Sequence, residues 1–230
     1  MAKTQHYYTP FEEGHLYHSY NRTVDKQPMF KNDGNYEFFL KKYDRYLSPV
    51  TDTYAYCLLG NHFHILLRVK ENLSAVPNLT ISDLTTKDLT TFEKLSNLNV
   101  NLIEERTPHS IVSHQFRKFF QSYAMAFNKQ QDRVGTLFQT PFKRVLVNSD
   151  AYFTQLVYYI HSNAQRHGLI DDFREWKWSS YKGILSEKPT KLKKQEVLEW
   201  FGGKTAYKEY HDQLQKILLD EKLYIEDDQI

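Results

Sequence analysis

The sequence predicts an α+β fold of the ferredoxin-like type, a split βαβ arrangement in which helices back an antiparallel sheet. The elements expected over residues 15–166 follow the order strand, helix, strand, strand, helix, strand, helix, and the first six members are the ferredoxin-like order. Apolar side chains recur with period two in the expected strands and with helical spacing in the expected helices. We also expect an inserted segment at 71–109 and a helical C-terminal extension.

A local pattern indicates each element. The expected elements are strand 15–21, helix 35–47, strands 53–59 and 62–69 joined by the turn pair Gly60-Asn61, helix 110–130, a broken strand 136–147, and a helix from 150 to about 166. Pro49 and Gly168 are expected to end the first and last helices, and Pro141 to interrupt the last strand. Ser110 is the expected N-cap of the second helix.

Two segments lie outside this predicted core. Residues 71–109 are rich in Asn, Thr, Ser and Leu, and an excursion of this length is unusual in a compact domain, so we interpret it as an insertion. Further along, residues 195–219 predict two short helices separated by a pair of glycines, followed by an acidic tail. The predicted division is therefore a domain of residues 1–185 and an extension of residues 186–230.

The formal charge of +2 conceals an uneven distribution. Residues 71–110 carry three basic and six acidic groups, and residues 220–230 carry one basic and five acidic groups. The rest of the chain therefore carries 26 basic and 17 acidic groups, net +9, and it is rich in aromatic residues. This combination favours a polyanionic partner such as nucleic acid. The alternative is that these lysines and arginines only solvate helix faces.

Several classes of protein are excluded by composition. The single cysteine, Cys57, excludes a disulfide framework and a Cys-rich metal cluster, and it is expected to be a small buried hydrophobe. No apolar run approaches 18 residues, so no membrane-spanning helix is expected. The first residues lack the apolar region of a secretory signal. We therefore expect a cytoplasmic protein that does not enter the membrane.

Two histidines of the expected hairpin are the first candidate functional residues. Residues i and i+2 of a strand lie on one face, so His62 and His64 point the same way while Phe63 points to the other face. Two neighbouring imidazoles can form part of a divalent metal site. The alternative is a partly exposed pair with a structural role.

A tyrosine on the last helix of the core is the second candidate. Residues i and i+4 share a helix face, so Tyr159 is grouped with Asn163, and Tyr158 with Ser162. Asn is a better oxygen ligand for a hard cation than Ser, which favours Tyr159 as the chemical residue and Tyr158 as a packing residue. The alternative is that both tyrosines belong to the core.

Together these motifs resemble those of a known enzyme family. The first strand, the segment Gly60–Leu67 and the segment Tyr159–Asn163 occur in the order and spacing of the single-tyrosine HUH endonucleases, the insertion-sequence transposases. The segments Gly168–Ile170 and Trp176–Tyr181 resemble, in particular, the REP-associated tyrosine transposase branch. The resemblance covers residues 14–185 apart from the insertion.

The resemblance implies a role for each of these residues. His62 and His64 match a histidine pair that binds Mg²⁺ or Mn²⁺, and Asn163 matches the polar residue that completes the metal shell. Tyr159 matches the nucleophile, which attacks single-stranded or hairpin DNA and leaves a 5′-phosphotyrosine and a free 3′-OH. His161 is the nearest candidate activator of the phenol, although it lies on a different helix face. A homodimer in which Tyr159 acts in trans stays open.

Basic residues around the expected site are the candidate DNA contacts. They are Arg117, Lys118, Lys143, Arg144 and Arg166.

The sequence leaves two other functions open. One is a non-catalytic nucleic-acid-binding protein on the same fold, which would tolerate the loss of Tyr159. The other is a zinc hydrolase, which needs a third ligand such as Asp150 or His161.

Overall fold

The computed structural model describes residues 8–73 and 107–221. Its elements are β1 (Leu16–Arg22), α1 (Asp33–Leu47), β2 (Thr51–Leu58), β3 (His62–Val69), α2 (Pro108–Gln130), β4 (Lys143–Val147), α3 (Asp150–Arg166), the 3-10 helix η5 (Phe173–Glu175), α4 (Tyr181–Leu185), α5 (Lys194–Phe201) and α6 (Lys204–Glu221). Most of the predicted insertion and of the predicted acidic tail lies outside the described residues. None of the described helices combines the length and the apolar character needed to cross a membrane.

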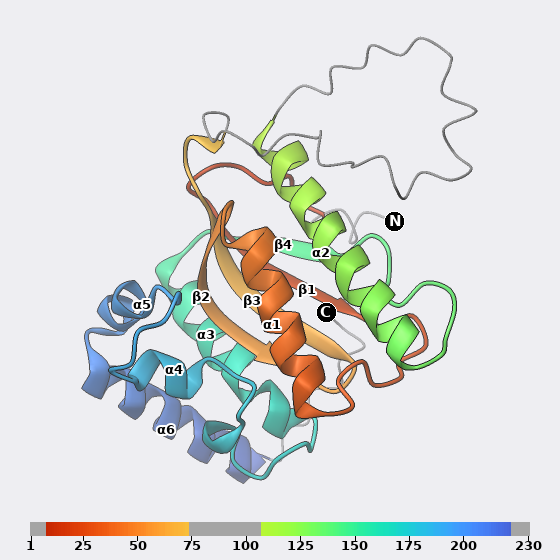
Figure 1. The fold of residues 1–230 in the computed structure, drawn as a ribbon. Coiled ribbons are helices and arrows are strands. Elements are labelled where there is room, and N and C mark those ends of the chain that lie inside the picture. The colour runs from red at the N-terminus through yellow and green to blue at the C-terminus, as the bar shows by residue number, and fades with distance from the viewer. Residues whose placement is uncertain (1–7, 74–106, 222–230) are drawn as a thin grey trace, which may run out of the picture.

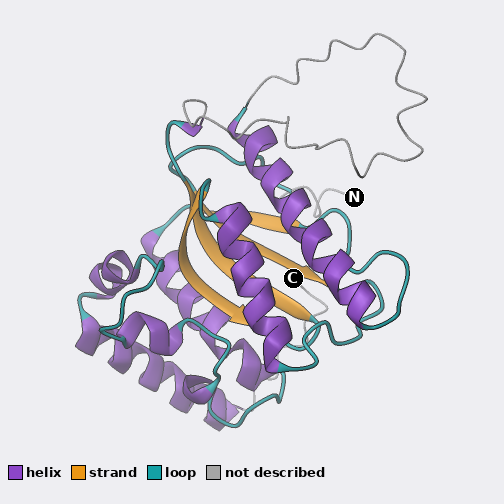
Figure 2. Ribbon diagram, in the orientation of Figure 1, coloured by secondary structure: helices purple, strands orange, loops and turns teal. Residues whose placement is uncertain are grey.

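The four strands form one sheet in the order β2-β3-β1-β4, and every neighbouring pair is antiparallel. Helices α1 and α2 cover one face of the sheet, and α3 covers the other (Figures 1 and 2). The strand order and the placement of α1 and α2 on one face are the ferredoxin-like arrangement, which confirms the predicted fold class. The C-terminal helices α4, α5 and α6 gather on the α3 side (Figure 1).

Alternation along β3 divides its side chains between two hydrophobic cores. Phe63, Ile65 and Leu67 pack in the core beneath α1 and α2, whereas Leu66 packs in the core beneath α3. The Phe63 ring lies 5.0 Å from the ring of Phe39 on α1. Full burial of one such ring stabilises the fold by about 1.5–3 kcal/mol. A slip of one residue in the register of β3 would lose this burial, so the core fixes which face the intervening histidines occupy.

One local prediction is wrong, and another is confirmed only in part. The N-cap of α2 is Thr107 rather than Ser110, because the helix begins at Pro108 and the Thr107 side chain accepts a hydrogen bond from the Ser110 amide. The predicted broken strand begins only at Lys143, because Pro141 has no amide hydrogen for the sheet. The residues before it form a loop that touches β-structure at a single bridge between Thr23 and Phe138.

The C-terminal extension is attached to the core by hydrogen bonds and by buried side chains. The Lys193 amide donates to the carbonyl of Thr53 on the outer strand β2 at 2.9 Å. Val197 of α5 and Tyr207 of α6 are fully buried in the core that they share with α3. The prediction of two helices separated by glycines is confirmed, although the second, α6, has 18 residues and is not short.

A buried pair of histidines joins α3 to α6. His161 Nδ1 and His211 Nε2 are 3.0 Å apart, and both side chains are inaccessible to solvent. His211 Nδ1 lies 2.8 Å from the Tyr207 carbonyl, which can only accept, so His211 accepts at Nε2 and His161 donates from Nδ1. His161 Nε2 then accepts from the Ser180 hydroxyl at 2.8 Å. The network is complete only while both rings are neutral.

We therefore expect stability to fall with pH below about 6.5, the ordinary histidine pKa. Burial lowers the pKa of His211 to about 4 and the pKa of His161 well below its usual value. As the pH falls, these histidines become protonated in the unfolded chain at a higher pH than in the folded chain. Each histidine therefore lowers the unfolding free energy by up to about 1.4 kcal/mol for every unit by which the pH falls. Urea unfolding at pH 7.5 and pH 5.5 measures the loss.

The control is a histidine at the surface. His211→Gln should reduce the difference in unfolding free energy between the two pH values, whereas His15→Gln, at an exposed position, should leave it unchanged. Equal pH dependence in His211→Gln and the unmodified protein would contradict this account of the buried pair.

Candidate active site

Strand β3 places His62 and His64 on the sheet face that α3 covers. Their ring centroids are 5.3 Å apart, and both side chains are buried. They line a cleft of about 40 Å³ together with Tyr20, Asn21, Arg22, Gln139, Pro141 and Lys143. A volume of this size holds an ion or a few water molecules, and it is far below the roughly 300–1,000 Å³ of pockets for drug-sized ligands.

The orientation of both imidazoles is fixed through Nδ1. His62 Nδ1 lies 2.6 Å from Asn61 Oδ1, and because an amide oxygen only accepts, the proton is on Nδ1 and the lone pair is on Nε2. His64 Nδ1 lies 3.0 Å from His18 Nε2. Burial lowers the pKa of His18 to about 3, so His18 is neutral and can accept from His64. With His64 donating, the lone pair of each imidazole is on Nε2, the usual arrangement for paired metal ligands.

From the sequence, His18 lies on the first strand, where it could flank the site but is expected to be structural, yet its imidazole is the one hydrogen-bonded to His64 Nδ1. It lies on β1, whose antiparallel register with β3 pairs Tyr20 with His64. The His18 and His64 ring centroids are 5.1 Å apart, and the Tyr20 ring lies 5.5 Å from His64. Period two along residues 15–21 already groups His18 with Tyr20, but only the strand register shows that this face adjoins the histidine pair.

Helix α3 brings Tyr159 to the histidines. Its ring centroid lies 5.6 Å from that of His64 and 6.1 Å from that of His18. Tyr158 packs instead against Phe173 and His211, as expected for residues 100° apart on a helix. The Tyr159 hydroxyl oxygen is buried and does not line the cleft. Tyr159 is therefore beside the histidine pair, and a reaction at its hydroxyl requires this atom to become accessible.

The C-terminal half of α3 also approaches the pair. Asn163 is buried and does not line the cleft, and its Nδ2 donates to the Tyr159 carbonyl at 2.8 Å, so its Oδ1 is the atom that could serve as a ligand. The His167 ring lies 4.7 Å from the His62 ring. No cluster of three or more His, Cys, Asp or Glu suited to a metal occurs in the described part of the chain. A cation here therefore needs a donor of another kind, such as the Asn163 amide, water or phosphate.

One of the zinc ligands considered for a hydrolase is engaged elsewhere in the structure. His161, the candidate third ligand and candidate activator of Tyr159, is engaged by His211 and Ser180. Asp150 is exposed at the N-terminus of α3. Neither observation favours a zinc site at the histidine pair.

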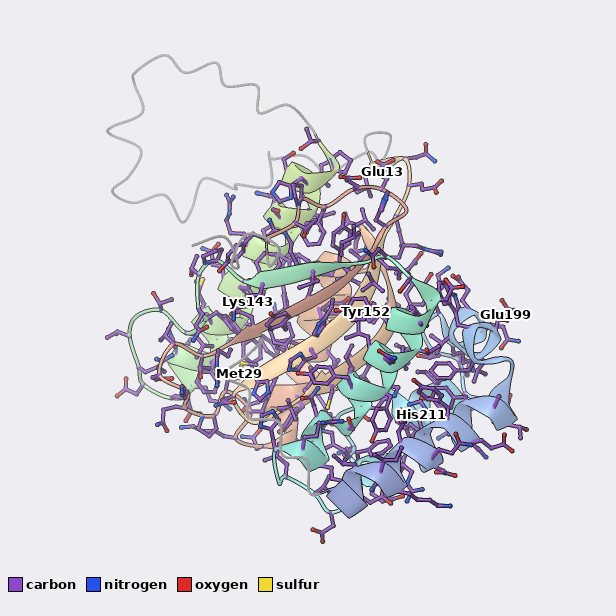
Figure 3. The ribbon with its side chains drawn as sticks, turned by 180° about the vertical axis from the view of Figure 1, so that it is seen from behind. Glu13, Met29, Lys143, Tyr152, Glu199 and His211 are labelled. Carbon is purple, nitrogen blue, oxygen red and sulfur yellow. The ribbon has the colours of Figure 1, made fainter. Side chains whose placement is uncertain are left out.

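The predicted DNA contacts are distributed over two faces. Lys143 lines the cleft, and its place on edge strand β4 is visible from the α3 side (Figure 3). The Arg166 guanidinium lies 6.0 Å from the Tyr159 ring centroid. Arg117 and Arg144 line a separate groove beside α2, and Lys118 lines neither. Arg144 is buried, and its Nε donates to the Thr9 carbonyl at 2.7 Å, so it holds the N-terminal segment as well.

The metal that the sequence predicts at the histidine pair gives a test: His18→Phe should bind Mn²⁺ about 10–100-fold more weakly than the unmodified protein, because His64 would lose the partner that fixes its ring. Titration calorimetry of the folded variant measures the affinity. His18→Gln, which keeps a hydrogen-bond acceptor, should retain more of it, and His15→Phe at the exposed position should change nothing. Unchanged affinity in a folded His18→Phe protein would show that His18 does not support the pair.

Comparison with known proteins gives one informative structural neighbour. No family model and no curated protein matches the sequence. Among solved structures, a REP-associated tyrosine transposase bound to a REP hairpin is similar, with a TM-score of 0.54 and 12% sequence identity. The match covers 80% of this chain and 87% of that chain. The similarity to this branch that the motifs predict is therefore confirmed at the level of the fold.

Proposed function

We propose that the protein is a DNA-binding, transposase-like endonuclease that nicks and rejoins single-stranded or hairpin DNA through a 5′-phosphotyrosine intermediate. The observation that carries this proposal is the packing of the Tyr159 ring 5.6 Å from His64, on the sheet face opposite α1 and α2. The solved transposase with this fold is bound to a REP hairpin, which supports hairpin DNA as the partner. Because Tyr159 and His64 meet within one chain, the arrangement favours attack in cis.

The side chains present fit a divalent cation. Nε2 of His62, Nε2 of His64 and Oδ1 of Asn163 would hold Mg²⁺ or Mn²⁺, with Asn61 and His18 fixing the two rings. A cation bound there would polarise the scissile phosphate and stabilise the leaving oxygen. The cleft of about 40 Å³, which both histidines line and Asn163 does not, has room for an ion.

Side chains of the protein would carry out the attack on phosphorus and stabilise the charge that develops. The Tyr159 oxygen forms a bond to phosphorus while the bond from phosphorus to the 3′-oxygen breaks, and the 3′-oxygen takes up a proton. The phenol loses its proton in the same process, to a base that the described residues do not identify. Arg166 and Lys143 carry positive charge beside the site and would stabilise the charge that develops on the phosphate. Attack of a 3′-OH on the phosphotyrosine reverses the reaction, so strands can be rejoined without ATP.

A non-catalytic nucleic-acid-binding protein is the second candidate function. The observation that favours it is the buried Tyr159 hydroxyl, which does not reach the cleft surface. The two candidates differ in one respect that can be measured. The nuclease requires the Tyr159 hydroxyl, whereas the binding protein does not.

We expect a covalent protein–DNA adduct when the protein is incubated with Mn²⁺ and a pool of hairpin oligonucleotides that carry randomised single-stranded flanks. A label at the 3′ end should migrate with the protein on a denaturing gel, because the tyrosine is joined to the 5′ phosphate of the downstream fragment. A label at the 5′ end should be released on the fragment that ends in a 3′-OH. His64→Ala and excess chelator should each reduce the adduct at least 100-fold, as loss of metal-assisted chemistry requires.

Neighbouring tyrosines provide the matched control. Tyr159→Phe should abolish the adduct and leave DNA affinity unchanged, whereas Tyr158→Phe, which alters the packing face of α3, should retain it. DNA binding without an adduct in the unmodified protein would favour the non-catalytic function. If Tyr158→Phe loses the adduct and Tyr159→Phe retains it, the nucleophile is Tyr158 and the assignment to Tyr159 is wrong.

A further inference from the structure

A groove beside α2 adjoins the histidine cleft. Its volume is about 480 Å³, and it is lined by one side of α2 and by the loop that precedes β4. Two loop residues, Gln139 and Pro141, line both the groove and the cleft. The groove therefore adjoins the candidate active site at this loop, although it lies on the other side of the sheet.

The inner wall of the groove is aromatic. Phe120 of α2 lies 4.9 Å from Phe138 and 5.4 Å from Phe142, measured between ring centroids. Phe120 and Phe142 are only half-buried, and both line the groove. Half-exposed phenyl rings in a groove of this size present flat apolar surface to a planar ligand, and bases stack on such rings with little dependence on sequence.

The charge of the groove is positive. Arg117 stands exposed at its rim, and Arg144 lies at its base near the Phe142 ring. The cleft adds Arg22 and Lys143. None of the described residues that line the groove or the cleft is acidic. Aromatic walls combined with positive charge and no carboxylate match a single-stranded nucleic acid better than a neutral apolar ligand.

Edge strand β4 connects the two surfaces. Consecutive residues of a strand point to opposite faces, so Lys143 is directed to the cleft and Arg144 to the groove. The cleft of about 40 Å³ is too small for a nucleobase, whereas the groove has the volume of a small-ligand pocket. A strand whose phosphate enters the cleft has to place its neighbouring bases elsewhere, and the adjoining space is at Pro141.

We propose that this groove binds the unpaired nucleobases next to the scissile phosphate, with the DNA strand passing around the start of β4 over Pro141. Bases stack on Phe120 and Phe142, and Arg117 contacts a backbone phosphate. This assignment rests on the proposed nuclease function and adds to it the surface that holds the single-stranded flank.

The first test removes an aromatic face and keeps the apolar volume. Fluorescence anisotropy compares a short labelled single strand of mixed sequence with an abasic strand of equal length. Phe120→Leu should weaken binding of the base-containing strand about 5–10-fold and leave the abasic strand unaffected, because only bases stack. Phe38→Leu, at a half-buried phenylalanine on α1 outside the groove, is the matched control and should change neither affinity.

The second test alters charge at exposed positions of α2. Gln121→Glu places a carboxylate in the groove and should weaken single-strand binding about 3–10-fold at low salt. Arg117→Gln should lower the slope of log affinity against log salt concentration by about one. Lys129→Gln removes one exposed charge from the same helix outside the groove and should leave the slope unchanged.

A third measurement locates the DNA directly. A single strand containing 5-iododeoxyuridine, irradiated in complex with the full chain, should crosslink to peptides that contain Phe120 or Phe142. Crosslinks confined to other peptides, or equal affinities in Phe120→Leu, Gln121→Glu and the unmodified protein, would overturn the groove assignment. The Tyr159-dependent adduct would still form in that case, which separates this failure from failure of the nuclease. A protein that binds no DNA and forms no adduct would overturn both.

Discussion

The alternation of side chains along β3 is the constraint on which the rest of the structure depends. Phe63 and Ile65 must enter the core beneath α1 and α2, and the histidines between and beside them must therefore face α3. Burial of these apolar side chains, worth about 1.5–3 kcal/mol each, thus fixes the direction of two polar side chains. The candidate metal ligands are held by the core rather than by a flexible loop, which is how a functional site acquires a defined geometry.

Helix α3 packs against the rest of the protein through two different faces. One face carries Tyr159 toward the histidine pair, and another carries Tyr158 and His161 into contact with the C-terminal helix α6. The extension is therefore packed directly behind the helix that holds the proposed nucleophile. Contacts on the α6 side help to hold α3 on the sheet, so they bear on whether the Tyr159 hydroxyl can reach the cleft.

Periodicity was enough to predict the fold and the placement of the central residues. Strand period two grouped His62 with His64, and helical spacing separated Tyr159 from Tyr158, because both patterns depend only on local backbone geometry. The role of His18 was not predictable in this way, because its contact with His64 depends on the register between two strands 46 residues apart. The Thr107 cap was missed because α2 begins at Pro108, before the expected cap. The interruption at Pro141 was predicted, but not that the residues before it form a loop with a single bridge at Phe138. The aromatic groove depends on the packing of α2 against a loop, for which one sequence carries no periodic signal.

Mass spectrometry of the trapped protein–DNA adduct, digested to peptides, tests the central claim most directly. The account predicts a nucleotide joined through phosphate to Tyr159, with Tyr158 and Tyr20 unmodified. Tyr20 matters because it lines the cleft and its ring lies beside His64. A nucleotide on Tyr20 or Tyr158 would contradict the assignment of the nucleophile to α3. The absence of any tyrosine-linked nucleotide on a protein that binds the same DNA would contradict the proposed chemistry itself.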